Sequence, residues 1–238
     1  MDTLDDFVMT RPATAQRPLL GLTVLVVEDS RFASEALRLL CLRSGARIRR
    51  ADTLSAARRH LRVYRPGAVI VDLGLPDGSG LDLIRELVTG QPRVDVILGM
   101  SGDPDTEAAV RAAGADGFLA KPLSKLAAFQ AAILAHLPQE RQPPGPRPLS
   151  DDEVSPDALA YRDDLAHVAD VLSAEDEGHV IAYLTQFLGG VARSAGDAPL
   201  SAAVEAVISS RAAGRPYRPE VARLAALVQA RLVSVAAI

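Results

Sequence analysis

Side chains that could bind a cation or a phosphate stand directly after four short apolar runs of the chain. Each run is followed at once by acidic, hydroxyl or ammonium groups: Glu28 and Asp29 after the first, Asp72 after the second, Ser101 after the third and Lys121 after the fourth. The lysine is conspicuous, because only Lys121 and Lys125 among the chain's 26 basic residues are lysines. If the four runs end at one edge of a fold, these groups meet in one place.

Such a group of side chains has a defined chemistry. Carboxylates about 4 Å apart repel one another by about 4 kcal/mol per pair at an effective dielectric constant near 20, so they must be protonated or bind a cation. Hard oxygen ligands favour Mg²⁺. Beside Mg²⁺ and an ammonium group, a carboxylate can attack a phosphoryl group and hold it as an aspartyl phosphate. We assign that attack to Asp72 and metal binding to Glu28 and Asp29, with Lys121 and Ser101 stabilising the phosphoryl oxygens.

The elements that would position these residues alternate between strands and helices. Apolar runs predict strands, and apolar residues at helical spacing predict a helix after each one; the strands fall at 23–27, 46–50, 68–71, 94–100 and 118–120. This alternation predicts an α/β fold with a parallel sheet and helices on both faces, in which ligands bind beyond the carboxyl ends of the strands. A simpler interpretation, in which each carboxylate only caps the next helix, explains one aspartate better than the whole set.

Four segments of the chain resemble the receiver domain of two-component response regulators. They are Val24–Ser30 (VLVVEDS), Val69–Gly80 (VIVDLGLPDGSG), Val96–Gly102 (VILGMSG) and Gly114–Leu123 (GADGFLAKPL). Their order and spacing match the family over roughly residues 20–137. The resemblance implies a flavodoxin-like (βα)₅ doubly wound parallel sheet.

The resemblance also implies a phosphoacceptor and a metal site. Asp72 would accept a phosphoryl group from a histidine kinase or a histidine phosphotransferase. Mg²⁺ would be bound by Asp29, Asp72, the backbone carbonyl of Gly74 and, through water, Glu28. The implied cofactor is therefore Mg²⁺.

The remaining implied roles concern the response to phosphorylation. Lys121 would pair with the phosphoryl group, followed by a cis peptide bond at Pro122. Ser101 and Phe118 would form the hydroxyl and aromatic switch pair of the family. Ser101 replaces the commoner threonine and keeps its hydroxyl, whereas Phe118 lacks the hydroxyl of a tyrosine.

Composition divides the chain into two parts. The segment 138–156 contains six prolines and almost no apolar residues, which predicts a stiff, extended and solvated linker. We predict an N-terminal extension at 1–19, a receiver domain at 20–138, a linker at 139–156 and an α-helical effector or dimerisation domain at 157–238. Apolar stripes at helical spacing predict four helices in that last part.

The charge of the C-terminal part bears on its function. Residues 151–238 hold 7 basic and 13 acidic residues, a net charge of −6 that disfavours binding to DNA. We therefore expect a downstream protein or a second copy of the chain as its partner. Two alternatives stay open: a DNA-binding transcriptional regulator with an atypical helical output domain, and a phosphorelay component that carries phosphate on His167 or His179.

The remaining features concern the cell compartment and the class of protein. The single cysteine, Cys41, suits a reducing compartment, and the acidic N-terminus does not resemble a secretory signal. The apolar stretch 19–27 is about half the length that a membrane span needs. We expect a cytoplasmic protein without membrane insertion, and not an enzyme beyond its own phosphorylation and dephosphorylation.

Overall fold

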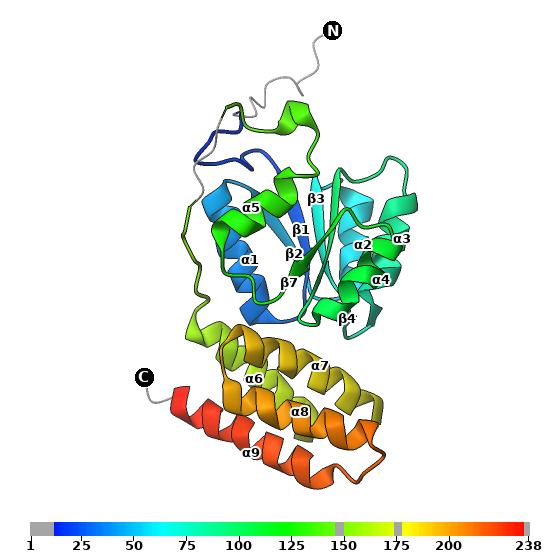
Figure 1. The fold of residues 1–238 in the computed structure, drawn as a ribbon, viewed down its shortest axis with the longest axis vertical. Helices are drawn as coiled ribbons and strands as arrows, with labels where there is room; N and C mark the ends of the chain where they lie inside the picture. The colour runs from blue at the N-terminus through cyan, green and yellow to red at the C-terminus, as the bar shows by residue number, and fades with distance from the viewer. Residues whose placement is uncertain (1–11, 146–149, 174–177, 236–238) are drawn as a thin grey trace.

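The computed structural model describes residues 12–145, 150–173 and 178–235. Within these ranges the chain forms two parts, an α/β domain and a bundle of helices that lies against one end of it (Figure 1). Residues 1–11 of the expected N-terminal extension lie outside the described residues.

The α/β domain is built on a five-stranded parallel sheet. The strands are β1 (Thr23–Val27), β2 (Arg47–Ala51), β3 (Ala68–Asp72), β6 (Val96–Ser101) and β7 (Gly117–Ala120). Their order is β2-β1-β3-β6-β7, and neighbouring strands run parallel throughout. This confirms the predicted doubly wound (βα)₅ fold. The order reverses between β1 and β3, so the carboxyl ends of those strands flank the crevice where such sheets bind ligands.

Helices cover both faces of this sheet. One face is covered by α1 (Arg31–Ser44) and α5 (Leu126–Leu134), and the other by α2 (Leu54–Val63), α3 (Gly80–Thr89) and α4 (Glu107–Ala112). Alternate residues of β1 serve the two cores, because side chains of a strand point alternately to opposite faces. Val24 and Val26 pack with α1 and α5, whereas Leu25 and Val27 pack with α2 and α3.

Short elements at the carboxyl end of the sheet complete the α/β domain. A two-residue ladder joins β4 (Gly74–Leu75) to β5 (Gly78–Ser79), and a 3₁₀ turn at Pro104–Thr106 precedes α4. A second 3₁₀ turn, Gln139–Arg141, follows α5. The ladder of β4 and β5 did not follow from the sequence pattern, since its glycine-rich strands are only two residues long.

The segment between the two parts is less solvated than its prolines predict. Val154 is buried in the core under α1 and α5, and its N–H donates to the carbonyl of Ser124 at 2.9 Å. The N–H of Leu126 donates to the carbonyl of Asp152 at 3.0 Å. The helix α5 begins after Lys125, and no side chain caps it.

The C-terminal part is all-helical, as the apolar stripes predict. Its four described helices are α6 (Ala158–Ser173), α7 (Gly178–Ser194), α8 (Ala198–Ala212) and α9 (Arg218–Val235). They share one apolar core, which includes Leu165, Leu188 and Val204. Asp197 links the helices: it caps α8 through Leu200 and accepts hydrogen bonds from Tyr161 of α6 and Arg231 of α9.

The bundle is in contact with the α/β domain through two of its helices. α6 and α7 pack against α1, and α7 also contacts β4 (Figure 1). The Phe32 ring of α1 meets the Tyr161 ring of α6 edge to face, with centroids 5.7 Å apart. None of the described helices is long and apolar enough to cross a membrane.

Candidate functional site

Three carboxylates converge at the carboxyl end of the sheet. Glu28 and Asp29 directly follow β1, and Asp72 ends the neighbouring strand β3. Each offers a carboxylate oxygen, and the three oxygens lie within 4.8 Å of one another. The structure therefore brings together the three acids that strand ends predict.

The ammonium group of Lys121 lies among these carboxylates. Its Nζ is 2.6 Å from Oε2 of Glu28 and 3.2 Å from Oδ1 of Asp72, and the side chain is only 9% exposed. Lys121 follows β7, two strands away from Asp72 in the sheet, so the parallel topology rather than the sequence distance brings the two together.

Burial makes these acids harder to ionise than exposed carboxylates. Burial raises the pKa of Glu28 and that of Asp72 to about 7, although Lys121 opposes both shifts. Burial likewise raises the pKa of Asp29 to about 6. Burial alone would lower the pKa of Lys121, yet the charges of Asp72 and Glu28 raise it above its ordinary value. One ammonium group is thus too little positive charge for three carboxylates.

A divalent cation would correct this imbalance. The convergent donors are hard carboxylate oxygens, which suit Mg²⁺ and leave room for water ligands. The backbone at Gly74 lines the same cavity, as a carbonyl ligand there requires. The residues present therefore fit the metal that the sequence predicts, with Glu28, Asp29, Asp72 and the carbonyl of Gly74 as its candidate ligands.

The other predicted site residues lie around this cluster. Ser101 ends β6, is buried, and its Oγ accepts a hydrogen bond from the N–H of Asp103 at 3.1 Å. The Lys121–Pro122 peptide bond is cis. Phe118 is partly buried against the core under α2, α3 and α4 and is not among the residues that line the cavity. Ser101 thus lines the cavity next to the acidic cluster, whereas Phe118 packs against the apolar core between the sheet and α2, α3 and α4.

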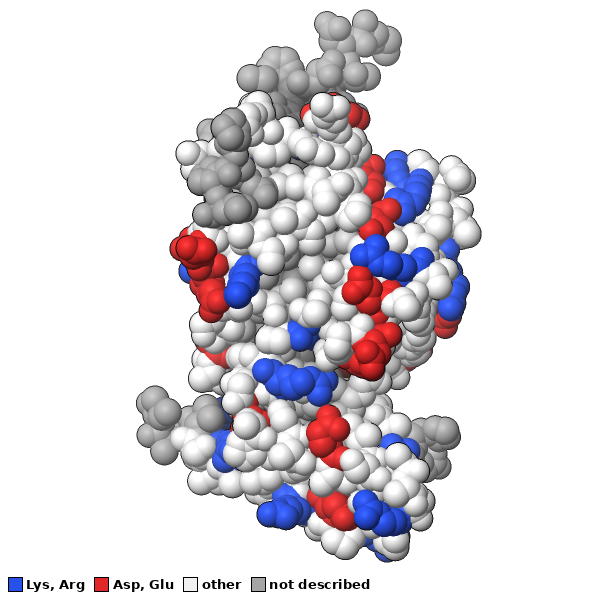
Figure 2. Space-filling view, viewed as in Figure 1, with Lys and Arg blue, Asp and Glu red and all other residues white. Residues whose placement is uncertain are grey.

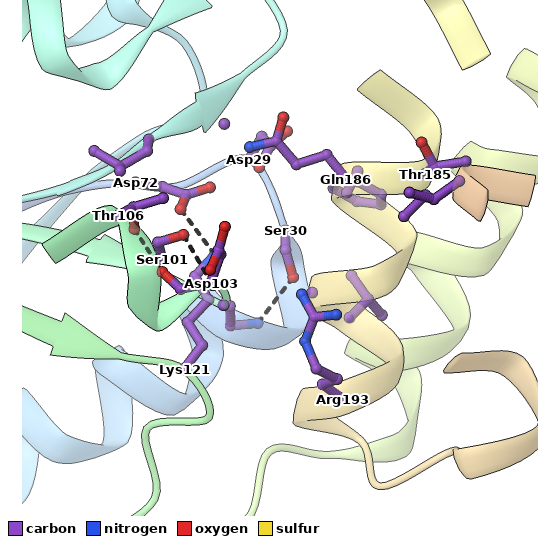
Figure 3. A pocket seen from close by; sticks show the side chains of 18 of the residues that line it. Asp29, Ser30, Asp72, Ser101, Asp103, Thr106, Lys121, Thr185, Gln186 and Arg193 are labelled. Carbon is purple, nitrogen blue, oxygen red and sulfur yellow. Dashed lines mark hydrogen bonds and ion pairs between the residues drawn. The ribbon is translucent and has the colours of Figure 1, made fainter. Parts of the chain in front are cut away.

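The cluster opens into a cavity of about 750 Å³ whose opposite wall belongs to the helical bundle. Residues from both parts line it, and Figure 3 shows Gln186 and Arg193 of α7 facing the strand ends that carry Asp29 and Asp72. A Cβ on Gly74 would come within 2.3 Å of the Gln186 amide nitrogen, which shows how closely α7 approaches. The site is therefore shared between the two parts.

Tyr183 of α7 contacts the predicted metal ligands directly. Its hydroxyl donates to Oδ2 of Asp29 at 2.7 Å. Burial and the neighbouring Asp29 carboxylate raise the pKa of this phenol, so the hydroxyl keeps its proton and remains a donor. The bundle thus supplies an uncharged hydrogen-bond donor, the Tyr183 hydroxyl, to the Asp29 carboxylate of the cluster.

Asp164 of α6 caps the N-terminus of α1 from the other part of the protein. Its carboxylate accepts from the Ser30 hydroxyl at 2.7 Å, from the Arg31 N–H at 2.8 Å and from the Phe32 N–H at 3.0 Å. The first N–H groups of a helix have no partner within the helix, and its N-terminus favours negative charge. Asp164 is only 2% exposed. The bundle is therefore anchored next to the acidic cluster.

Sequence reasoning missed the contribution of the bundle to the site. Asp164 and Tyr183 belong to no motif, and Asp164 is one of 13 acidic residues between 151 and 238. The sequence analysis named two histidines as possible phosphate carriers. One of them, His167, is exposed on α6 and packs edge to face on Phe187. His167 is not among the residues that line the cavity, and the side chain of His179 lies outside what the structure describes.

Comparison with known proteins shows which proteins the α/β domain resembles. The family model of the response regulator receiver domain matches residues 24–133. The chain is 32% identical over 126 residues to the KDP operon transcriptional regulatory protein KdpE of Escherichia coli (strain K12), a match that covers 53% of this chain and 56% of KdpE. It is 29% identical over 103 residues to the cell cycle transcriptional regulator CtrA of Caulobacter vibrioides (strain NA1000 / CB15N), covering 43% and 45%.

A solved structure resembles the same region. The receiver domain of a signal transduction histidine kinase from Syntrophus aciditrophicus is 27% identical, with a TM-score of 0.44, and the match covers 49% of this chain and 90% of that one. The chain spans about half the length of the curated relatives that it matches.

Proposed function

We propose, from the membership of residues 24–133 in the response regulator receiver family, that this chain is a phosphorylation-controlled signalling protein. A histidine kinase or a histidine phosphotransfer protein would phosphorylate Asp72, and the helical bundle would pass the change on to a protein partner. The observation that supports this best is the cluster of three buried carboxylates beside Lys121. Such a cluster fits Mg²⁺ and a transferred phosphoryl group.

The proposed transfer is a substitution at phosphorus. An oxygen of Asp72 attacks the phosphorus of a phosphohistidine, the O–P bond forms as the P–N bond breaks, and the departing imidazole takes up a proton. Lys121 and the hydroxyl of Ser101 stabilise the charge on the phosphoryl oxygens. Mg²⁺, when bound, would neutralise further charge on these oxygens and favour the ionised form of Asp72.

Phosphorylation by a small donor tests this proposal. We expect acetyl phosphate with Mg²⁺ to add one phosphoryl group to the full chain, seen by intact mass, and neutral hydroxylamine to remove it, as an acyl phosphate requires. Asp72→Asn is expected to gain none, because it has lost the attacking oxygen. Asp82→Asn is the matched control, since Asp82 is exposed on α3 and pairs with Arg85. Equal labelling of Asp72→Asn would refute the assignment.

Binding to DNA is a second candidate, because KdpE and CtrA are named as transcriptional regulators. Those matches cover only about half of this chain, and residues 151–238 carry a net charge of −6. On the face of the bundle that Figure 2 shows, basic and acidic side chains are interspersed. Binding of the full chain to duplex DNA that weakens steeply with added salt would favour this candidate over a protein partner.

A further inference from the structure

We propose that Arg193 of the helical bundle binds the phosphoryl group on Asp72, so that phosphorylation holds the bundle closed on the receiver domain. This inference rests on the proposed function and adds a residue and a direction to it. The bundle would be part of the phosphate-binding site, and the phosphorylated protein would be the more tightly closed form.

The position of Arg193 is the first argument. Arg193 lines the same cavity as Asp72, Ser101 and Lys121. Figure 3 shows Arg193 on the side of the cavity opposite the strand ends. A Cβ added to Gly102 would lie 2.7 Å from a guanidinium nitrogen of Arg193. Gly102 directly follows Ser101, whose hydroxyl is at the phosphoryl site. The guanidinium group therefore rests on the loop that carries one of the proposed phosphate-binding groups.

The charge of the site is the second argument. Glu28, Asp29 and Asp72, when ionised, and Lys121 carry a net charge of −2, which a bound Mg²⁺ would bring to zero. Phosphorylation replaces one carboxylate charge with a phosphate of about −1.5 to −2 at neutral pH. The phosphorylated site is then again negative. Arginine supplies the missing charge and can make two parallel hydrogen bonds to phosphate oxygens.

The present partner of Arg193 is the third argument. Its Nη1 lies 3.8 Å from Oε1 of Glu205, beyond ordinary hydrogen-bond distance, and the two side chains are 39% and 60% exposed. An ion pair that is so long and exposed contributes little stability. Arg193 can therefore leave Glu205 for a phosphate at little cost.

The anchoring contacts of α1 offer a direct measurement of closure. The N–H groups of Arg31 and Phe32 have no partner within α1 and donate to Asp164 of the bundle. Their hydrogen exchange is slow only while the bundle is closed. Exchange of these two amides, followed in the full chain with acetyl phosphate and Mg²⁺, thus reports closure, and intact mass gives the phosphorylated fraction of the same sample.

The expected result is a slowing on phosphorylation that depends on Arg193. We expect the two amides to exchange about five- to tenfold more slowly in the phosphorylated chain than in the same chain without acetyl phosphate. Arg193→Gln should show less than a twofold slowing although it gains the same mass, and Arg193→Lys should keep part of the effect. Arg223→Gln, which removes an exposed arginine of α9, should respond as the wild type does.

Three outcomes would contradict the proposal. Faster exchange of the wild-type amides on phosphorylation would mean that the phosphate opens the protein. A slowing in Arg193→Gln equal to that of the wild type would remove Arg193 from the phosphate site. A wild-type chain that gains no phosphoryl mass would refute the proposed function itself, and this inference with it, so the mass measurement separates the two failures.

Discussion

At the scale of single residues, the site is governed by the cost of burying acids without a metal. Asp72 illustrates it, since burial raises its pKa from the ordinary 3.8 to about 7. A pKa shift of one unit corresponds to about 1.4 kcal/mol, so ionising this group in the folded, metal-free chain costs on the order of 4 kcal/mol more than in an exposed aspartate. The proposed chemistry needs the ionised form, and a cation in the cluster is the means to obtain it.

This cost predicts how stability depends on pH and on Mg²⁺. In metal-free protein the folded chain holds protons on Asp72 and Glu28 that the unfolded chain has lost, so the free energy of unfolding falls as the pH rises from about 4 to about 7. Mg²⁺ bound by the ionised acids of the folded chain would stabilise it by linkage. We therefore expect Mg²⁺ to raise the melting temperature by several degrees at pH 8 and by much less at pH 5.

Calorimetry with Mg²⁺ or with a chelator, at both pH values, measures this difference. Asp29→Asn is the matched variant, because it removes one predicted ligand and should reduce the gain at pH 8. An equal rise in melting temperature at pH 5 and pH 8 would show that the metal does not act through these acids.

At the scale of the elements, the site depends on how closely α3 approaches the end of β3. A Cβ on Gly80, the first residue of α3, would lie 2.0 Å from the carbonyl oxygen of Asp72. That contact is with backbone, which cannot turn aside as a side chain can. The start of α3 and Asp72, the proposed phosphoacceptor, therefore share one tight junction.

This junction predicts a contrast between two glycines. We expect Gly80→Ala to lower the free energy of unfolding by about 1–3 kcal/mol through overpacking and to slow phosphorylation by moving Asp72. Gly190→Ala, in the interior of α7, meets nothing within 4 Å and should raise the free energy of unfolding by about 0.5–1 kcal/mol. Urea unfolding measures the change in the free energy of unfolding for each variant, and we expect opposite signs for the two. A Gly80→Ala variant as stable as the wild type would contradict the argument.

The elements also show what the sequence could and could not predict. Buried strands read as apolar runs, and in a parallel sheet the residues after them must share one edge, so Asp72 and Lys121 could be placed together. The left-handed Gly45 that ends α1 follows from similarly local chemistry. The burial of Val154 in the proline-rich segment does not follow from local chemistry, because it depends on pairing with the distant backbone of Ser124. Local patterns predicted α6 and α7 but carried no information about the surface that these helices cover.

At the scale of the whole molecule, the closed arrangement is held by few polar contacts, of which Asp164 makes three. Its neighbour Asp163 pairs with Arg31 at 2.8 Å, but both of those side chains are at least half exposed. Hydrogen bonds to a buried charge each contribute about 1.5–3 kcal/mol, whereas an exposed ion pair contributes about 0–1 kcal/mol. Two adjacent aspartates of α6 thus differ greatly in what they contribute to closure.

We therefore expect Asp164→Ala to separate the bundle from the receiver domain and Asp163→Ala to leave them together. Losing three hydrogen bonds of that strength should cost about 5–9 kcal/mol of closure, a change of more than roughly 1,000-fold in the equilibrium between closed and open forms. Small-angle X-ray scattering should then give a larger radius of gyration for Asp164→Ala alone, with faster exchange of the Phe32 amide. If both variants stay as compact as the wild type, the apolar contacts of α6 and α7 with α1 suffice to close the protein. Asp164 would then serve only as the cap of α1.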